Sequence, residues 1–438
     1  MKTFRIAIIS FLLALLCTTA WAKAINVKSL GAKADGKTMA TKVIQKAIDQ
    51  VSAAGGGSVI ISGGTFLSGP IELKSGVDLH IDADATLLAS PDIKDFPNRT
   101  DARHYDTDAL PRRRNAAFIY ADEAENIAIS GRGRIDCNGQ YHICPVPDDE
   151  YRGGWPFKRI HPTEQTLPRV VFFAGCRYVT VTDVTMVNQP AGWSYWVHDC
   201  DFVHFDRCKI LSDMRFPNND GIHINCSRDV TVSNCIIEAG DDAVIVRANS
   251  RSLKEPRICE RVVVTNCTLK SWAYAIRLGW SNDGHIRNCI FSNLVITKSW
   301  LGIGIDFPRP GYNNDFGLES SLIEEIIFSN IIMDEIYECP LHMYVYPDES
   351  VKFEGVRNIY FTDVHARSLC GIEIFSPEDH PYENLVFTNC SFTKVPPSVF
   401  TLDEDTRRRR DAMGEGDCRG SHIENVKGLI FNNTVFRE

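Results

Sequence analysis

The residues best suited to chemistry are three aspartates in two short motifs. Asp220 ends the tripeptide Asn-Asn-Asp at 218–220, and Asp241 and Asp242 form a pair that follows it by 21 and 22 residues. A strand-like run at 229–235 separates the two motifs. Parallel strands in a stack lie about 4.8 Å apart. If the interval is one turn of a coiled β scaffold, the three carboxylates therefore meet on one face.

Such a trio has the equipment for glycoside hydrolysis. Three neighbouring carboxylates cannot all ionise without cost, so the pKa of one should rise and leave an acid beside ionised bases. The acid protonates the leaving oxygen and a carboxylate activates water, and a separation of about 6.5–9.5 Å gives inversion of configuration. Gly240 before the pair allows the backbone turn that both side chains need to reach one face.

Other readings of the same residues stay open at this point. Asn-Asp-Gly is also a common turn sequence, so the aspartates could serve turns alone. Three oxygen ligands could instead bind calcium. Calcium-assisted elimination, the polysaccharide lyase reaction, would further need a basic residue, for which Lys209 and Arg247 are candidates.

The surrounding chain predicts an all-β fold, a right-handed parallel β-helix in one domain over residues 23–438. Short β-rich runs ending in Asn or Asp recur, and the intervals between the first four ends, at 183, 206, 234 and 266, are 23, 28 and 32 residues. A β-sandwich would show hairpin turns at shorter spacing. Apolar residues at helical spacing over 40–51 predict one N-terminal helix that caps the stack.

Four polar interruptions, at 96–115, 141–165, 308–319 and 401–420, predict loops beside a groove. Arg407 to Arg410, in the last of them, is expected to be solvated. The loops at 141–165 and 401–420 favour action at chain ends if they block that groove.

The N-terminus predicts export to the periplasm or the exterior. Residues 1–22 read as a signal peptide, with Lys2 and Arg5 before an apolar stretch and Ala20-Trp21-Ala22 as the cleavage site. A lipid anchor at Cys17 is the alternative. Removing Lys2 and Arg5 changes the net charge from −9 to −11. So acidic a chain is not expected to bind nucleic acid or a membrane surface, and a monomer is expected.

The 15 cysteines allow two interpretations. An exported protein could pair them in disulfides, of which Cys137 with Cys144 is the most plausible local pair. Many instead follow an asparagine or a like residue at one repeat position, which favours a buried stack of thiols. The members of this pattern are Cys208, Cys235, Cys267, Cys289 and Cys390.

At the aspartate motifs the chain resembles glycoside hydrolase family 28, the polygalacturonases and related pectin hydrolases. Leu30 to Gly36, the Gly-Gly-Gly at 55–57 and Ile129 to Asp136 are similar to the family's N-terminal coils. The resemblance covers nearly the whole mature chain. It implies a pectin-lyase-like β-helix, inverting hydrolysis, no metal and no organic cofactor. Asp220 would be the general acid or share that role, and Asp241 and Asp242 would position and activate water.

Two family motifs are replaced in this chain. Ala273-Tyr274-Ala275 stands where the family has Gly-His-Gly, and Gly302 to Asp306 stands where it has Arg-Ile-Lys. We therefore expect other residues to contact substrate. The candidates are Asn218, His223, Arg247, Tyr274 and Arg277, with Arg247 and Arg277 as an anion clamp and Trp193 and Trp280 as sugar-stacking rings.

Together these features predict a secreted hydrolase of plant cell-wall polysaccharide, pectic or rhamnogalacturonan-type. The rivals are a carbohydrate-binding β-helix without catalysis and a polysaccharide lyase.

Overall fold

The computed structural model describes residues 23–437, apart from 98–115, 143–168, 308–319, 347–351, 414–418 and short gaps at 191, 215, 217, 251 and 281–282. The predicted signal peptide, Cys17 and Cys144 lie outside the described residues, as do most of the first three predicted loops. No helix of the described part is long and apolar enough to cross a membrane.

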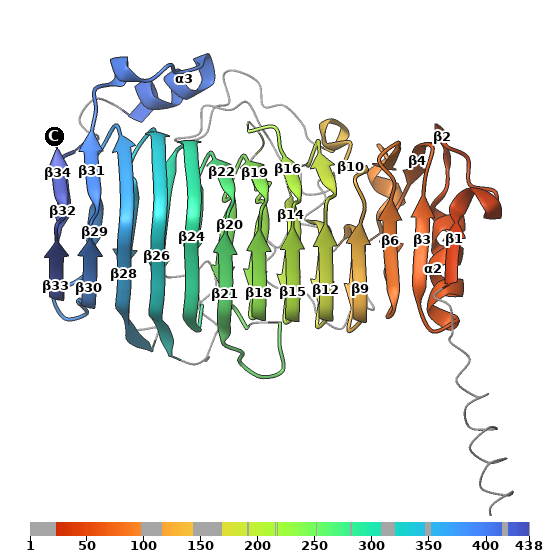
Figure 1. Ribbon diagram of the computed structural model, residues 1–438, viewed down its shortest axis with the longest axis horizontal. Coiled ribbons are helices and arrows are strands. Elements are labelled where there is room, and N and C mark those ends of the chain that lie inside the picture. Colours follow the sequence, from red (N-terminus) through yellow and green to blue (C-terminus); the bar gives the residue numbers. More distant parts are fainter. Residues whose placement is uncertain are drawn as a thin grey trace, which may run out of the picture.

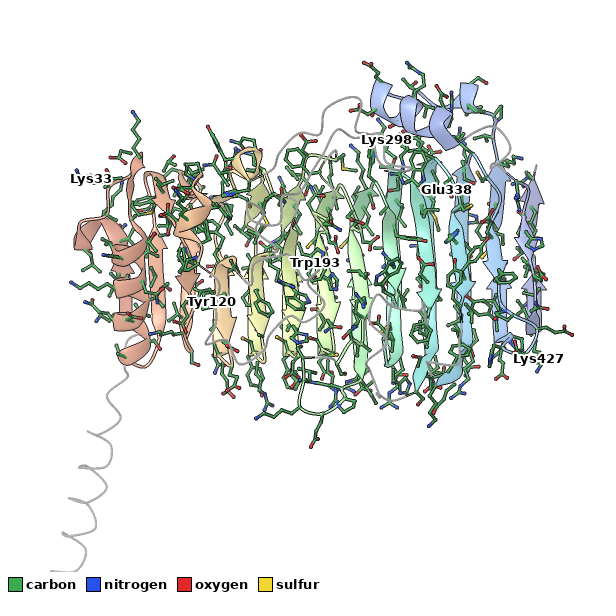
Figure 2. All side chains as sticks on the ribbon, turned by 180° about the vertical axis from the view of Figure 1, so that it is seen from behind. Lys33, Tyr120, Trp193, Lys298, Glu338 and Lys427 are labelled. Carbon is green, nitrogen blue, oxygen red and sulfur yellow. The ribbon has the colours of Figure 1, made fainter. Side chains whose placement is uncertain are left out.

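Two parallel sheets extend along an elongated molecule and stack its coils side by side (Figure 1). The eleven strands of the smaller sheet are β5 (Ile71–Glu72), β8 (Ala117–Asp122), β11 (Arg169–Ala174), β14 (Trp193–His198), β17 (Ile222–Asn225), β20 (Val244–Arg247), β23 (Tyr274–Leu278), β25 (Leu301–Phe307), β27 (Leu341–Val345), β29 (Glu373–Phe375) and β32 (His422–Ile423). In Figure 2, Tyr120 and Trp193 mark two strands of this sheet, and Lys33 and Lys427 mark opposite ends of the stack.

The larger sheet has 23 strands and forms the rest of each coil. They are β1 (Lys23–Asn26), β2 (Asp35–Met39), β3 (Gly57–Ile61), β4 (Gly64–Ser68), β6 (Val77–Ile81), β7 (Ala85–Ala89), β9 (Glu125–Ser130), β10 (Arg134–Asp136), β12 (Arg177–Thr182), β13 (Thr185–Val187), β15 (Asp201–Asp206), β16 (Lys209–Leu211), β18 (Arg228–Ser233), β19 (Ile236–Ala239), β21 (Cys259–Thr265), β22 (Thr268–Ser271), β24 (His285–Ser299), β26 (Ser321–Ile336), β28 (Phe353–Ser368), β30 (Tyr382–Thr388), β31 (Ser391–Lys394), β33 (Val426–Asn432) and β34 (Val435–Arg437).

Each strand pairs with its counterpart one coil later, as β14 does with β11 before it and β17 after it. This pairing, with connections of the usual right hand, confirms the predicted right-handed parallel β-helix.

The core forms because like residues of successive coils stack on one another. Phe291, Phe328, Phe361 and Phe387 are aligned by strand register, and their neighbouring ring centroids lie 5.1, 4.9 and 4.8 Å apart. All four are fully buried. Along many strands of the larger sheet, buried residues alternate with more exposed ones, so one face of these strands fills the interior.

The recurring Asn and Asp residues mark corners where the backbone is left-handed. Asp183, Asn234, Asn266 and Asn389 have φ between 55° and 66°, a region that Asn and Asp tolerate better than other side chains do. In the second coil the corner residue is Arg207 (φ 55°) and not Asp206, one position from the prediction.

Two helices cover one end and one edge of this stack. The predicted N-terminal helix is confirmed as α2 (Thr41–Ala53), which buries Ile44, Ala47, Ile48 and Val51 at the end of the stack. The second helix, α3 (Glu404–Met413), lies over one edge near the other end (Figure 1). Short 3₁₀ helices occupy Val27–Leu30, Ile93–Asp95, Gly139–Tyr141 and Pro397–Val399.

Helix α3 corrects the expectation of a solvated basic loop at residues 407–410. Arg409 is buried, donates to the backbone oxygen of Trp272, and places its guanidinium carbon 3.7 Å from the centroid of the Trp300 ring. The charged sequence did not indicate this contact, because a single position of a helical turn can point inward from an otherwise polar segment, as Arg409 does while Arg407 stays exposed.

The predicted thiol stack forms only in part. Cys208, Cys235 and Cys267 are buried on successive coils, and the Cys267 sulfur lies 3.4 Å from the Cys235 amide nitrogen. Cys289 departs from the prediction, because it lies inside β24 opposite Ile326 and follows a different corner. Cys390 is buried three coils beyond that of Cys289. Cys137, Cys208, Cys235, Cys267, Cys289 and Cys390 are free thiols.

Candidate active site

The two aspartate motifs lie side by side at the start of β17 and β20. Ile222 of β17 is opposite Val244 of β20, and Asp220 and Asp242 each stand two residues earlier. The Gly221 amide donates to the Asp242 backbone oxygen at 2.9 Å. The interval of 22 residues is therefore one coil, as predicted.

Asp242 is buried and held by two N–H groups. Its Oδ1 accepts from the Tyr274 amide at 3.1 Å, and its Oδ2 accepts from Arg277 Nη1 at 2.9 Å. Burial raises the pKa of Asp242 to about 6, although Arg277 opposes the shift. One carboxyl of the trio therefore has a raised pKa, as predicted, but it is Asp242, which the family resemblance makes a base and not the acid.

The side chain of Asp241 points away from that of Asp242, because the backbone bends after Gly240. Its Oδ2 accepts from the backbone nitrogen of Asn218 at 3.0 Å and from the Asn218 side chain at 3.3 Å. Asn218 therefore contacts the trio directly. Gly240 makes the bend possible, because a Cβ there would meet the Phe216 backbone oxygen at 2.2 Å.

His223 of β17 stands against Asp220, which precedes that strand. Its Nδ1 lies 3.1 Å from Asp220 Oδ2, and both side chains are buried. Burial, with Arg247 and Arg169 nearby, lowers the pKa of His223 well below its usual value, so the ring is neutral. A neutral imidazole can donate to a carboxylate or accept from a carboxylic acid, so Asp220 keeps this partner in either protonation state. Trp193 packs on His223 with ring centroids 4.0 Å apart.

Tyr274 and Arg277 lie on β23, one rung beyond Asp242. The Tyr274 hydroxyl donates to Asp306 Oδ2 at 3.1 Å and lies 2.8 Å from His342 Nδ1. Arg277 Nη2 lies 3.8 Å from Asp306 Oδ2, and its guanidinium carbon is 3.6 Å from the Trp280 ring centroid. Two carboxylates therefore share the Arg277 charge, which favours a role in orienting Asp242 over a free anion clamp.

Arg247 does not join Arg277 in a clamp. It forms a two-bond ion pair with Asp283, with N–O distances of 2.7 and 2.8 Å, and both side chains are buried. Lys209 lies exposed on β16 of the larger sheet. The two candidate bases for elimination are thus an ion-paired arginine and a lysine on another sheet. Among the described residues no group of three or more acidic, His or Cys side chains is placed to hold a metal.

Sequence reasoning missed several polar residues beside the trio. Asp306, His342 and Glu373 follow Arg277 along the outer face of the smaller sheet. Arg169 lies on the other side of His223, stacked 3.9 Å from the Trp196 ring centroid. Inward and outward positions alternate along Gly302–Phe307. Because Ile303 and Ile305 point inward, this alternation could have placed Asp306 on the outer face. His342 and Glu373 carry no motif of their own.

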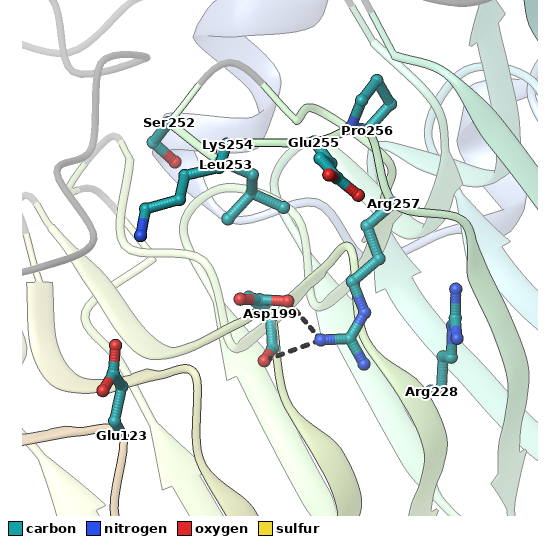
Figure 3. A pocket seen from close by; sticks show the side chains of 9 residues that line it. All are labelled: Glu123, Asp199, Arg228, Ser252, Leu253, Lys254, Glu255, Pro256 and Arg257. Atoms are coloured by element: carbon teal, nitrogen blue, oxygen red, sulfur yellow. Dashed lines mark hydrogen bonds and ion pairs between the residues drawn. The ribbon is translucent and has the colours of Figure 1, made fainter.

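A cavity of about 840 Å³ lies at the opposite ends of the smaller-sheet strands (Figure 3). Glu123 and Asp199, which follow β8 and β14, line it together with residues 252–257. Arg257 bonds the carboxylate and the backbone oxygen of Asp199 within it. Both arginines of this cavity, Arg228 and Arg257, are already paired with carboxylates, and the aspartate motifs lie at the other ends of the strands, so this cavity is not part of the candidate site.

Comparison with known proteins assigns the chain to a family. The model of Glycosyl hydrolases family 28 matches residues 57–373. A "Probable polygalacturonase" of Vitis vinifera is 26% identical over 67% of this chain and 59% of its own length. An "Endo-polygalacturonase" of Pectobacterium carotovorum subsp. carotovorum is 27% identical over 70% of this chain and 74% of its own.

The crystal structure of an exopolygalacturonase from Thermotoga maritima shares the fold. It superposes with a TM-score of 0.71 at 18% identity, covering 95% of this chain and 92% of that one. The family model spans 317 of the 438 residues (373 − 57 + 1), including Asp220, Asp241 and Asp242. The chain belongs to Glycosyl hydrolases family 28.

Proposed function

We propose that this protein hydrolyses glycosidic bonds in pectic polysaccharide, with inversion of configuration, at Asp220, Asp241 and Asp242. The observation that carries the proposal is the placement of Asp220 and Asp242 on adjacent rungs, with Asp242 held by Arg277 and the Tyr274 amide. Family membership and the relatives' names support this reaction and this substrate.

The contacts suggest a division of roles within the trio. Asp242 acts as the base that activates water, because two N–H donors stabilise its anion. Asp220 acts as the acid, because its neutral partner His223 serves both protonation states. Asp241, which Asn218 orients, shares in positioning the water or the leaving oxygen. Removing one such group costs on the order of 10²–10⁴ in rate.

The finer assignments belong to the same proposal. The chain is exported, as its basic and apolar N-terminus supports, and acts on plant cell-wall pectin, in line with the relatives' names. The proposal also takes it to act as a monomer. Tyr274 and Trp280 contact the sugar near the trio. Helix α3 lies over Trp272 and Trp300, close to Tyr274, and its place at this edge supports action at chain ends.

The test is digestion of a panel of pectic oligosaccharides by the wild type and by Asp220→Asn and Asp242→Asn. New reducing ends of inverted anomeric configuration, lost in both variants, support the proposal. Ultraviolet absorbance from an unsaturated uronate would show elimination instead, and binding without cleavage would show a binding module. Full activity of Asp220→Asn would overturn its role as acid. Release of single sugar units would show exo action, and products of mixed length would show endo action.

A further inference from the structure

One row of the smaller sheet continues from Arg277 away from the trio. Strand register aligns Arg277, Gly304, His342 and Glu373 on four successive rungs, and we call these four the downstream row. Their strand neighbours Ile303, Ile305, Leu341 and Ile374 are buried in the core. The downstream row therefore lies on the outer face, next to the proposed reaction centre.

The surroundings of the downstream row are acidic. Asp306 lies within reach of Arg277 and Tyr274, and Glu373 accepts from the Tyr344 hydroxyl at 2.9 Å. Burial lowers the pKa of His342 despite Asp306 and Glu373 nearby, so His342 adds no charge near neutral pH. Arg277 is the cation of this row, and Asp242 and Asp306 share it.

Hydrogen-bond donors and acceptors lie on both sides of the rung that carries Gly304, a residue without a side chain. The Tyr274 ring fills this space, because a Cβ at Gly304 would lie 2.1 Å from Tyr274 Cε1. Burial raises the pKa of Tyr274, which keeps its hydroxyl protonated. On one side, the buried Nε and Nη2 of Arg277 make no hydrogen bond, and on the other stand the carboxylates of Asp306 and Glu373.

A sugar hydroxyl fits this alternation better than a carboxylate does. A hydroxyl accepts from an arginine N–H and donates to a carboxylate at the same time, whereas a carboxylate only accepts. A uronate would add a negative charge beside Asp306 and Glu373 in a poorly hydrated place, where like charges repel strongly.

We propose that the sugar unit bound outside the Tyr274 ring, on the rung of Gly304, is neutral and is recognised through its hydroxyls by Arg277, Asp306 and His342. At the next sugar position along the substrate, the carboxylate of Glu373 repels a uronate. This rests on the proposed function, because it takes the substrate to be a pectic chain that crosses the trio. It makes Asp306 and Glu373 specificity-determining residues.

The test compares two ligands that differ only in charge: an α-1,4-linked oligogalacturonate and the same oligosaccharide with its carboxyl groups reduced to primary alcohols. Binding is measured by calorimetry on Asp220→Asn, and kcat/KM on the wild type. We expect the reduced ligand to bind at least tenfold more tightly. Equal or tighter binding of the acidic ligand, or binding of neither, would overturn the inference. Cleavage of either ligand by the wild type upholds the proposed function whatever the preference.

Variants test whether the downstream row causes that preference. Asp306→Asn and Glu373→Gln should each improve the acidic ligand relative to the reduced one by about threefold or more. Glu373→Gln is the cleaner variant, because Asp306 also holds Tyr274. Glu383→Gln removes the same charge from an exposed position of β30 in the larger sheet and should leave the ratio unchanged. An unchanged ratio in both Asp306→Asn and Glu373→Gln would remove these residues from specificity.

Discussion

Arg277 donates to Asp242 across 2.9 Å from the next strand of the sheet, and both side chains are buried. The pair couples the charge state of the proposed base to one cation. Burial alone would push the pKa of Asp242 further up, and Arg277 restrains it near 6. The site is thereby set to lose its base in mildly acidic solution.

Activity should therefore rise with pH through a midpoint near 6, because Asp242 must be ionised to activate water. Arg277→Gln removes the opposite charge, so the pKa of Asp242 rises and the acidic limb moves to higher pH by roughly one unit or more. The pH profile of kcat/KM checks this. Arg257→Gln, which breaks an ion pair at the distant cavity, is the control and should leave the limb in place. If the acidic limb of the pH profile does not move in Arg277→Gln, then Arg277 does not set the pKa of Asp242.

Tyr274 and Gly304 should behave as a coupled pair. Gly304→Ala inserts a methyl group into the Tyr274 ring, so the phenol must leave Asp306 and His342, and we expect activity to fall at least tenfold. In a Tyr274→Ala background the space is open, and the same Gly304→Ala change should have little further effect. A double-mutant cycle on kcat/KM measures this coupling. Additive effects would mean that the ring does not depend on the missing side chain.

The sequence predicted the coil and the trio because both depend on local rules. Corner residues such as Asn234 and Asn266 adopt a left-handed backbone that few other side chains tolerate, so the repeat shows in the chain itself. One coil in such a stack brings Asp220 beside Asp242 without further information.

The partners of Arg247, Arg277 and Arg409 could not be read in the same way. Arg247 and Arg277 pair with residues of other coils, and Arg409 reaches Trp272 from a helix of the C-terminal part. Sequence spacing says nothing of such contacts. In the sequence, an arginine in a strand looks the same whether it faces a ligand or an aspartate. Glu373 likewise gains its place only through strand register, 131 residues beyond Asp242.

The corner asparagines should contribute to stability through their backbone conformation. Asn266 has φ 56°, and Asn266→Ala should lower the free energy of unfolding by up to about 1–2 kcal/mol, because alanine meets the cost of this region without the local hydrogen bonding that an asparagine side chain provides. Asn266→Gly adopts the conformation freely and should lose less, since its cost is mainly chain entropy and the contact to Asn234. Urea unfolding midpoints of the two variants provide the comparison. If Asn266→Gly lowers stability as much as Asn266→Ala does, the loss comes from the side-chain contact and not from the backbone conformation.

Arg409 should anchor helix α3 to the edge of the stack beside Tyr274. Its guanidinium lies against the Trp300 ring and donates to the Trp272 backbone, so Arg409→Ala should cost about 2–4 kcal/mol from the lost cation–π contact and charged hydrogen bond. Arg410→Ala is the matched control, because Arg410 pairs on the surface with its neighbour Asp411 and should cost less than about 1 kcal/mol. Hydrogen exchange over 404–413 should speed up in the first variant alone. Equal protection of α3 in both variants would show that the helix is held by other contacts, and that Arg409 is not its anchor.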